Sequence, residues 1–442
     1  MKNINEVETV IVGGGQAGLS VSYHLKLLER DHVVLEQAKQ AANAWRNHRW
    51  DSFTLNTPNW QSQLQGGGMP GSDPDGFLTR DEVVAYFENY IKRNQLPVQY
   101  GMRVSAIKPS LSGYSIETNV GCFRARNVVV ATGVYQQSRI PRFTGALSQD
   151  ILQLHSDSYR NPELLPTGAV LVVGSAQSGA QIAEELYQSG RKVYLSVSSS
   201  GRVPRRYRGK DVNWWSNALG MYDRTVGELK SPRDRFDAKP HISGTKGGHT
   251  INLHQFASHG VTLLGRVMEL DFAKVRLARD LHKNLVAADQ FEANVAARID
   301  RYVEEHGVVV PQEVLPKLTA GFEQLERDEL DLKQADINSV IWATGYSFDF
   351  SLVRLPILDA DGYPIQQRGV TAYPGLYFVG MPWLHNARSG LIFGVSEDAR
   401  YLASHISMRQ LSETSCCPEF SESGISDLKP MPLSGICLAQ SQ

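Results

Sequence analysis

The sequence VIVGGGQAGLS, residues 10–20, decides the fold class of this 442-residue chain. It begins in an apolar run typical of a buried strand and ends in a helical pattern, and a second strand is predicted at residues 33–36. Gly13, Gly15 and Gly18 form the pattern G-x-G-x-x-G between the strand and the helix. In that pattern the first glycine permits a tight turn, the second lets a pyrophosphate approach the backbone, and the third lets helix and strand pack closely. The stretch therefore predicts a Rossmann-type dinucleotide site.

A carboxylate follows this turn at the end of the second predicted strand, where Glu36 comes 18 residues after Gly18. A carboxylate in this place accepts hydrogen bonds from both ribose hydroxyls of an adenosine and repels a 2′-phosphate. The helix after the turn offers free N–H groups and a positive dipole end to phosphates. These features favour FAD, because in two-site flavoproteins the flavin usually takes the amino-terminal unit. The residues predicted to bind it here are Gly13, Gly15, Gln16, Ala17, Gly18, Glu36 and Gln37.

The same design recurs at LVVGSAQSGAQIAEEL, residues 171–186. Gly174 and Gly179 occupy the first and third glycine positions, and Ala176 adds one methyl group at the second. The repeat of strand, turn, helix and strand extends over residues 169–197 and indicates a second dinucleotide site. The residues predicted to bind that cofactor are Gly174, Ser175, Gln177, Ser178 and Gly179.

Basic residues, and no carboxylate, follow the last strand of the second unit. The chain runs from four serines between residues 196 and 200 into RVPRRYRGK, residues 202–210. Hydroxyl and guanidinium groups suit a 2′-phosphate, which favours NADPH over NADH. Arg202 and Arg205 are the predicted phosphate ligands, although a basic run is also commonly a solvated face.

The composition is that of an ordinary globular protein, with 42% hydrophobic and 21% charged residues. A formal net charge of −1 gives no electrostatic basis for nucleic acid or an acidic membrane surface as a partner. The sequence has no signal-peptide pattern, no apolar run of about 18 residues and no metal-ligand spacing. Four cysteines without a spaced framework are typical of the cytoplasm, where we expect this protein. The oligomeric state is open, with a homodimer among the alternatives.

These patterns predict an α/β fold with two Rossmann-like dinucleotide-binding domains, the second inserted into the first. A leucine occurs at every fourth residue at Leu277, Leu281 and Leu285, and this spacing predicts a helical insertion in the second domain. After about residue 410 the periodicity ends, and Ser, Pro and Cys accumulate. The predicted division is 1–160 and 335–410 for an FAD domain, 161–334 for an NADPH domain with its helical insertion at about 275–327, and 411–442 for a loosely ordered tail.

With both units placed, residues 8–405 resemble the class B flavin monooxygenases, the group of flavin-containing monooxygenases and Baeyer–Villiger enzymes. The segment AWRNHRWDSFTLNTP, residues 44–58, is similar to the part of that family that wraps the flavin. The resemblance implies that Trp45 and Arg46 border the cofactor. It also implies that Asn56 and Thr57 correspond to the Asn–Ser/Thr pair beside the isoalloxazine.

Further motifs extend the resemblance. Two ATG motifs are similar to the family's strand ends where the chain crosses between domains, which implies cofactor contacts for Ala131, Thr132, Gly133, Ala343, Thr344 and Gly345. The segment FTGALSQDILQLHSDSYRNP resembles the family fingerprint, with matching residues Phe143, Gly145, His155, Ser156 and Tyr159. We expect His155 to link the two domains through hydrogen bonds. By the same analogy, Asp398 approaches the ribityl chain of the flavin.

Details of the motifs separate branches of the family. The Baeyer–Villiger fingerprint ends in Trp-Pro, whereas Tyr159-Arg160 here favours the branch that oxidises heteroatoms. The segments VPRRYRGKD and KPHISGTKGGHT resemble a bacterial branch of largely unassigned substrate, with members in specialised metabolism. The family's usual Arg just after the second unit's strand is absent here, and Ser198 lies near that position. The resemblance therefore leaves open which arginine binds the 2′-phosphate.

The resemblance implies a monooxygenase that uses FAD, NADPH and O₂ on a small-molecule substrate. NADPH would reduce the flavin, oxygen would add at flavin C4a, and one oxygen atom would pass to nitrogen, sulfur or an electron-rich carbon. Such an adduct needs a dry, hydrogen-bonded pocket, and Asn56 is the predicted catalytic residue because an amide donates a hydrogen bond without donating its proton.

Three alternatives use the same architecture. A flavin disulfide reductase needs a redox-active cysteine pair near the flavin, whereas Cys122 is alone and Cys416 and Cys417 are adjacent near the carboxyl end. An NADPH oxidase resembles an uncoupled monooxygenase in its sequence. A redox-sensing flavoprotein without catalysis would also bind both cofactors, but it would not consume NADPH steadily in air.

Overall fold

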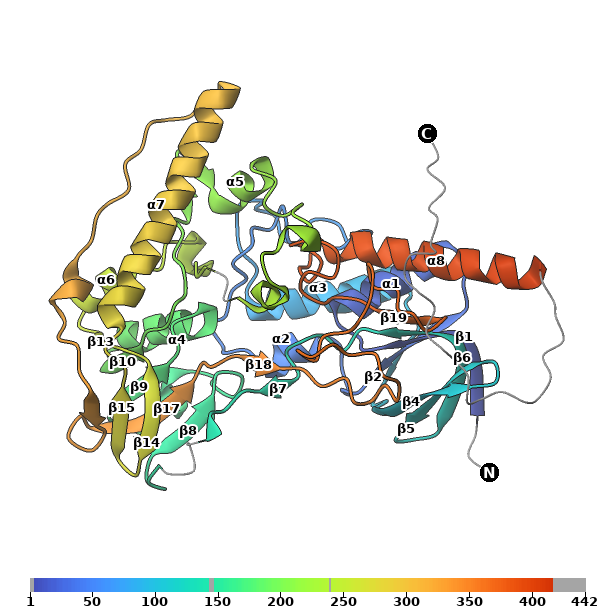
Figure 1. Ribbon diagram of the computed structural model, residues 1–442, viewed down its shortest axis with the longest axis horizontal. Coiled ribbons are helices and arrows are strands. Elements are labelled where there is room, and N and C mark those ends of the chain that lie inside the picture. Colours follow the sequence, from blue (N-terminus) through green and yellow to red (C-terminus); the bar gives the residue numbers. More distant parts are fainter. Residues whose placement is uncertain (1–3, 143–146, 238–239, 416–442) are drawn as a thin grey trace.

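The computed structural model describes residues 4–142, 147–237 and 240–415, with side chains up to Arg409. Two α/β bodies lie side by side and are joined by chain segments that cross between them (Figure 1). Each body is built on its own sheet, which is mainly parallel in the first body and wholly parallel in the second. The predicted α/β class with two Rossmann-like units is therefore confirmed.

The first sheet forms around the strand that precedes the first glycine turn. Its strand order is β3-β2-β1-β6-β5-β4, and β19 pairs with β6 in parallel although it lies far along the chain. The central strands are continuous apolar runs because both faces of the sheet are covered. The strands are β1 (Ile4–Val12), β2 (His32–Glu36), β3 (Val98–Tyr100), β4 (Val104–Ser110), β5 (Gly113–Thr118), β6 (Cys122–Val130) and β19 (Leu376–Phe378).

Four helices belong to this first body: α1 (Gln16–Leu27), α2 (Asn43–Asn47), α3 (Arg80–Asn94) and α8 (Val395–Ser415). Helices α1 and α8 pack along each other (Figure 1). Thr79 begins α3 with a capping box, in which Glu82 accepts from the Thr79 N–H. Helix α8 continues to Ser415, so residues 411–415 of the predicted tail are helical, and residues 416–442 lie outside the described residues.

The second sheet is parallel throughout, with the strand order β13-β10-β9-β17-β8. Its strands are β8 (Leu152–His155), β9 (Ala169–Val173), β10 (Val193–Ser196), β13 (Thr262–Leu264) and β17 (Ile337–Trp342), and its helices are α4 (Gln177–Gln188) and α6 (Leu253–Ser258). Strands β8 and β17 pair in this second sheet, although they lie in the ranges 1–160 and 335–410 that are predicted for the FAD domain. The second ATG motif follows β17, so it belongs with the second glycine turn and not with the first sheet.

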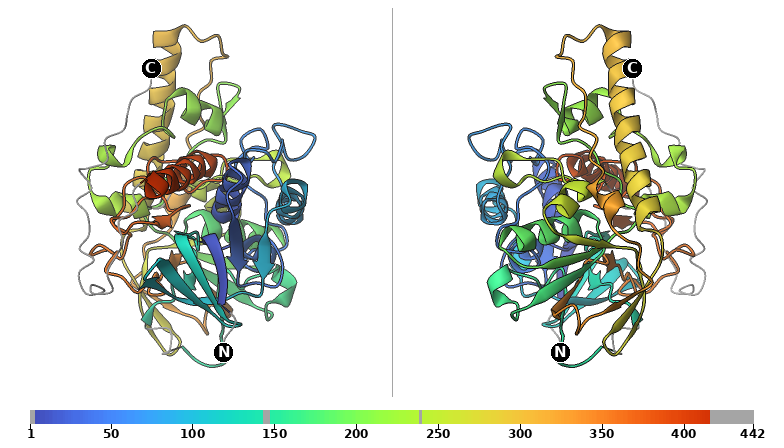
Figure 2. Two further views of the ribbon diagram at one scale, coloured as in Figure 1. Left: turned by 90° about the vertical axis from the view of Figure 1, so that its right-hand side faces the viewer. Right: turned by 90° about the vertical axis from the view of Figure 1, so that its left-hand side faces the viewer.

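The insertion after β13 is less helical than its sequence pattern predicts. A three-stranded meander, β14 (Val267–Asp271), β15 (Lys274–Leu277) and β16 (Glu329–Asp331), accompanies α7 (Leu281–His306). Leu277 ends a strand, and residues 307–319 return without helix before the short turn η6 (Ala320–Glu323). Gly307 in the left-handed region ends α7, and two prolines follow it. Helix α7 projects from the second body (Figures 1 and 2).

The crossing segments pair as a small antiparallel ribbon of β7 (Gln137–Ser138) and β18 (Tyr346–Ser347). A hairpin and a short helix follow the second unit's β10: β11 (Arg206–Tyr207), β12 (Lys210–Asp211) and α5 (Val212–Ala218). The remaining single turns are η2 (Pro162–Leu164), η3 (Val226–Glu228), η4 (Pro232–Phe236) and η5 (Thr245–Gly247). Within the described ranges, no helix has both the length and the apolar character to cross a membrane.

Candidate dinucleotide and flavin-edge sites

The two glycine turns are built alike. Gly13 has a φ of +111°, and a Cβ there would lie 2.5 Å from the carbonyl oxygen of Ala131. Gly174 has a φ of +104°, and a Cβ there would lie 2.6 Å from the carbonyl oxygen of Ala343. Each turn thus packs on the alanine of an ATG motif, which explains why the motif occurs twice.

The third glycine of each turn brings the helix against the strand. A Cβ at Gly18 would overlap the carbonyl oxygen of Gly13, and a Cβ at Gly179 would overlap that of Gly174. In contrast, a Cβ at Gly15 would meet no atom of the described residues within 4 Å. The turn at Gly15 is therefore open on the side from which a pyrophosphate would approach.

Both helix amino termini are free of side-chain caps. Helix α1 begins after Gly15 and α4 after Ala176, and among the described residues neither helix has a side-chain cap hydrogen bond at this end. Such groups and the positive helix end suit a phosphate. The geometry of both turns therefore fits a dinucleotide. The Gln16 side chain donates a hydrogen bond to the Gly390 carbonyl at 2.9 Å. Ala17 packs against Gly380.

Glu36 ends β2 beside the first turn. Its Oε2 accepts from the Gly14 N–H and its Oε1 from the Ala38 N–H, both at 2.8 Å. A carboxylate has about four acceptor positions, so it retains capacity for ribose hydroxyls. Gln37 is exposed next to it. The fit to an adenosine ribose is therefore good.

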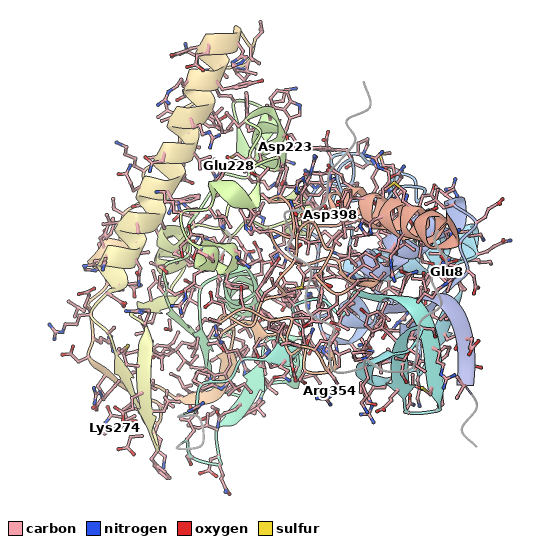
Figure 3. The ribbon with its side chains drawn as sticks, turned by 45° about the vertical axis from the view of Figure 1, so that its right-hand side comes forward. Glu8, Asp223, Glu228, Lys274, Arg354 and Asp398 are labelled. Carbon is pink, nitrogen blue, oxygen red and sulfur yellow. The ribbon has the colours of Figure 1, made fainter. Side chains whose placement is uncertain are left out.

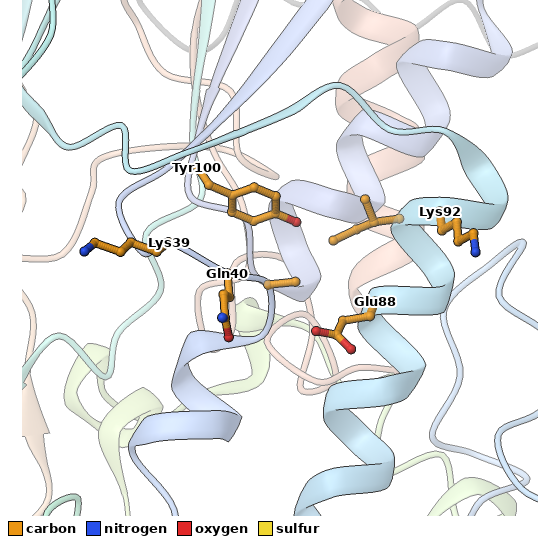
Figure 4. A pocket seen from close by; sticks show the side chains of 7 residues that line it. Lys39, Gln40, Glu88, Lys92 and Tyr100 are labelled. Atoms are coloured by element: carbon orange, nitrogen blue, oxygen red, sulfur yellow. The ribbon is translucent and has the colours of Figure 1, made fainter.

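A surface hollow of about 300 Å³ lies on the α3 side of this loop (Figure 4). Burial, with the charges of Glu36 and Glu88, raises the pKa of the Tyr100 phenol that forms one wall. None of the predicted cofactor residues lines the hollow, whose walls are Lys39, Gln40, Ala41, Glu88, Ile91, Lys92 and Tyr100. We assign it no part in dinucleotide binding.

The predicted flavin-edge segment is held from several sides. Trp45 packs on Phe53, with ring centroids 5.8 Å apart, and Arg46 forms a 2.6 Å ion pair with Glu88 on α3. Thr57 Oγ1 accepts from Ser62 at 2.8 Å. These contacts fix the fold of residues 45–57, and whether the same side chains touch a flavin stays a prediction.

Asn56 lies half-buried at the junction of the two bodies. Its carbonyl oxygen accepts from Arg205 Nη1, across the junction, at 2.7 Å. Within the part of the chain that the structure describes, its side-chain amide has no hydrogen-bond partner. The amide is therefore available to a ligand.

Side chains of the second turn hold the turn itself. Ser175 is buried and accepts from the Ser198 N–H at 3.0 Å. Gln177 donates to the Ile242 carbonyl at 2.6 Å and accepts from the Ile242 N–H at 3.2 Å. Ser178 lies half-exposed in the first turn of α4, where it remains a predicted cofactor contact.

Arg202 and Arg205, which are predicted to bind a 2′-phosphate, both have carboxylate partners in the structure. Arg202 forms ion pairs of 2.8 Å with Asp289 and 2.7 Å with Glu292, both on α7. Arg205 pairs with Asp211 at 2.5 Å. Both guanidinium groups are buried, and without Arg202 the buried carboxylate of Glu292 would lose its cation. The sequence did not reveal these pairs, because it does not show which distant carboxylates α7 brings near.

The contacts of the fingerprint and ATG residues lie within the second body or in the segments that cross between the bodies, and the domain link expected of His155 stays a prediction. His155 Nε2 lies 2.9 Å from the Gly345 carbonyl, and the buried Tyr159 hydroxyl donates to Glu185 on α4 at 2.8 Å. Thr132 accepts from Gln136 at 3.0 Å, and the Thr344 hydroxyl donates to the Arg139 carbonyl. Gly133 and Gly345 have positive φ, and a Cβ at either position would meet no described atom within 4 Å. Phe143 and Gly145 lie outside the described residues.

Asp398 lies in the first turn of α8 and is 1% exposed (Figure 3). Burial raises the pKa of its carboxyl, while Ser389, His385 and Arg368 act in the opposite direction. The predicted approach of this carboxylate to a ribityl chain stays a prediction.

His249 anchors the glycine-rich segment 243–249 to α4 through Glu184, 2.7 Å away. This hydrogen bond raises the pKa of His249. Because the pKa is raised in the folded state, the bond stabilises the fold at low pH, and the stabilisation is lost as pH rises from about 6.5 through the raised value. We expect Glu184→Gln to lower the pKa of His249, measured by NMR titration with His249→Gln as the assignment control. An unchanged pKa would contradict the pairing.

The comparisons with known proteins agree with this geometry. Residues 10–217 match the family described as pyridine nucleotide-disulphide oxidoreductase. An uncharacterised CzcO-like oxidoreductase of Geobacillus kaustophilus is 34% identical over 405 residues, which are 90% of this chain and 98% of the relative. The chain belongs to the CzcO-like oxidoreductase family.

Two further relatives support the resemblance to class B flavin monooxygenases. Indole-3-pyruvate monooxygenase YUCCA1 of Oryza sativa is 29% identical over 204 residues, 45% of this chain and 50% of that protein. A flavin-containing monooxygenase from Stenotrophomonas maltophilia has the same fold, with a TM-score of 0.63 and 21% identity over 92% of this chain and 99% of that one. Both likenesses agree with the predicted resemblance to class B flavin monooxygenases, the first in sequence over part of the chain and the second in fold.

Proposed function

We propose that this protein is an FAD- and NADPH-dependent monooxygenase that transfers one oxygen atom from O₂ to nitrogen, sulfur or an electron-rich carbon of a small molecule. The observation that carries the proposal is the Asn56 amide, which has no partner in the described chain and lies where Arg205 of the second body contacts the first. A flavin monooxygenase needs both cofactors to meet beside a hydrogen-bond donor.

The chain's own groups divide the work. The free amino termini of α1 and α4 would bind the pyrophosphates, and Glu36 would bind the adenosine ribose of FAD. Strand β10 ends in Ser196 and is followed by serines, which favours NADPH over NADH at the second turn. Bound FAD supplies the electron transfer to O₂ after reduction by NADPH. The Asn56 amide would donate a hydrogen bond to oxygen without transferring a proton.

A disulfide reductase is less well supported by the described residues. Cys122 is the one cysteine among them, and it lies at the first residue of β6, the opposite end of that strand from Ala131. A reductase would gain two reactive thiols after reduction by NADPH, which a thiol titration measures directly.

Asn56→Leu tests the proposal. We expect anaerobic flavin reduction by NADPH to be unchanged and release of H₂O₂ after mixing the reduced enzyme with O₂ to be about 100-fold faster, because one preorganised donor is lost. Stopped-flow absorbance and a peroxidase-coupled assay measure the two steps, without knowledge of the substrate.

Asn56→Asp is the control for shape, because it keeps the volume and removes the donor at neutral pH. It should release H₂O₂ as fast as Asn56→Leu. If Asn56→Leu releases H₂O₂ as slowly as the natural chain, Asn56 has no part in oxygen chemistry. If the natural chain itself releases H₂O₂ at once, the protein is an oxidase.

A further inference from the structure

A buried arginine of the second body holds the backbone of Asn56. Arg205 is 2% exposed, and its Nη1 donates to the Asn56 carbonyl at 2.7 Å. Its Nε and Nη2 donate to Asp211 Oδ2 at 2.8 and 2.5 Å. One face of the guanidinium lies over the Phe77 ring, 4.5 Å from its centroid. Each of these contacts fixes the direction of the Arg205 side chain.

The support of Arg205 is itself rigid. The Arg205 N–H donates to Thr250 Oγ1 at 2.8 Å, and its carbonyl accepts from Val212 at 2.9 Å. Asp211 also accepts from the Asn213 N–H at 2.8 Å and so caps α5. The arginine therefore belongs to the β11–β12 hairpin and α5 of the second body, and reaches the first body only with its guanidinium.

The two bodies touch closely beside Asn56 as well. A Cβ at Gly244 would overlap the carbonyl oxygen of Leu55. The hydroxyls of Thr54 and Thr245 lie 3.3 Å apart. A Cβ at Gly248 would lie 2.6 Å from the Phe77 ring. The loop at 244–248 is thus fitted to the segment that contains Asn56.

We propose that Arg205 is a positioning residue that sets the direction of the Asn56 side chain. A charge-assisted hydrogen bond to the Asn56 carbonyl fixes the peptide plane that follows Asn56, and with it the backbone from which the amide projects. Through Arg205, the second body thereby fixes the direction of the Asn56 amide, the hydrogen-bond donor that belongs to the first body. This inference rests on the proposed function of Asn56 in oxygen chemistry.

The test uses full-length protein loaded with FAD. Arg205→Met alone leaves Asp211 buried and unpaired, so the main variant is Arg205→Met with Asp211→Leu, which removes both charges. We expect anaerobic flavin reduction within about twofold of the natural chain and H₂O₂ release about tenfold faster. The visible circular dichroism of bound oxidised FAD should change as well, because it reports the flavin surroundings without turnover.

A triple variant that adds Asn56→Leu separates positioning from general stability. If Arg205 acts through Asn56, the triple variant releases H₂O₂ no faster than Asn56→Leu alone, because both changes remove one donor. Arg30→Met is the matched control, since it breaks a partly buried 2.6 Å ion pair with Glu8 at the other end of α1. It should lower the melting temperature and leave H₂O₂ release unchanged.

The outcomes separate the two proposals. Faster release in Asn56→Leu together with unchanged release in the Arg205 and Asp211 variant would overturn the role of Arg205 and leave that of Asn56 standing. Unchanged release in Asn56→Leu would overturn the function proposed for Asn56, and this inference with it. Additive acceleration in the triple variant would show that Arg205 acts on the site independently of Asn56.

Discussion

Alanine at Gly15 should leave the protein folded and lower its affinity for FAD about tenfold or more, whereas alanine at Gly18 should destabilise the whole first body. The added methyl at Gly15 meets no protein atom within 4 Å, so it projects into the space that the proposed pyrophosphate would occupy. The methyl at Gly18 overlaps the Gly13 carbonyl. Overpacking of this kind costs about 1–3 kcal/mol and at times more.

Two measurements separate these effects. Thermal unfolding of the protein without FAD should show a lower melting temperature for Gly18→Ala only, and fluorescence titration with FAD should show the weaker binding of Gly15→Ala. Gly227→Ala is a suitable control, because a Cβ there meets only the Thr225 hydroxyl at 3.9 Å. If Gly15→Ala binds FAD as tightly as the natural chain, the first turn is not the pyrophosphate site.

The glycine turns could be predicted because their chemistry is local. Each needs a strand, a tight turn and a helix within about 20 residues, and such a pattern is visible in one stretch of sequence. The structure adds a pairing that the pattern does not show, in which Gly13 packs on Ala131 and Gly174 on Ala343. In each sheet the strand before the ATG motif pairs with the strand before the glycine turn, β6 with β1 and β17 with β9. Strand β17 therefore belongs to the second sheet.

The partners of the basic run could not be predicted in the same way. Arg202 meets Glu292 across 90 residues of sequence, and Arg205 meets Asn56 across 149. Sequence spacing gives no measure of such contacts, and a run of arginines suits a phosphate as well as it suits buried carboxylates. Helix α7 decided the outcome for Arg202, because its inner face brings Asp289 and Glu292 to the loop after β10.

The junction at Asn56 could not be predicted from the sequence. The stretch KPHISGTKGGHT resembles a branch of the family, but its sequence does not show which segment it contacts. The structure shows that segment to be residues 54–55, through Gly244 and Thr245. The predicted catalytic asparagine and the least explained stretch of the second body thus meet in one place.

Methionine at Arg202 should lower the stability of the second body by about 3–5 kcal/mol, because it leaves the Glu292 and Asp289 carboxylates without their cation. Glu292 is only 8% exposed, so water cannot replace the lost partner fully. In thermal unfolding without nucleotide we expect a fall in melting temperature of roughly 5–10 °C. Adding Glu292→Met should recover most of the loss, since it removes the more deeply buried of the two unpaired charges.

The same variant tests the ion-pair role of Arg202 against the predicted role in binding a 2′-phosphate. If Arg202 bound a 2′-phosphate, Arg202→Met would keep its melting temperature and raise the KM for NADPH well above that for NADH, because a guanidinium–phosphate bond distinguishes the two. We expect instead that the ratio of the two KM values, measured by anaerobic flavin reduction of the folded double variant, stays within about twofold of the natural chain. Selectivity for NADPH would then depend on groups other than the buried Arg202, whose guanidinium serves to hold α7 against the loop after β10.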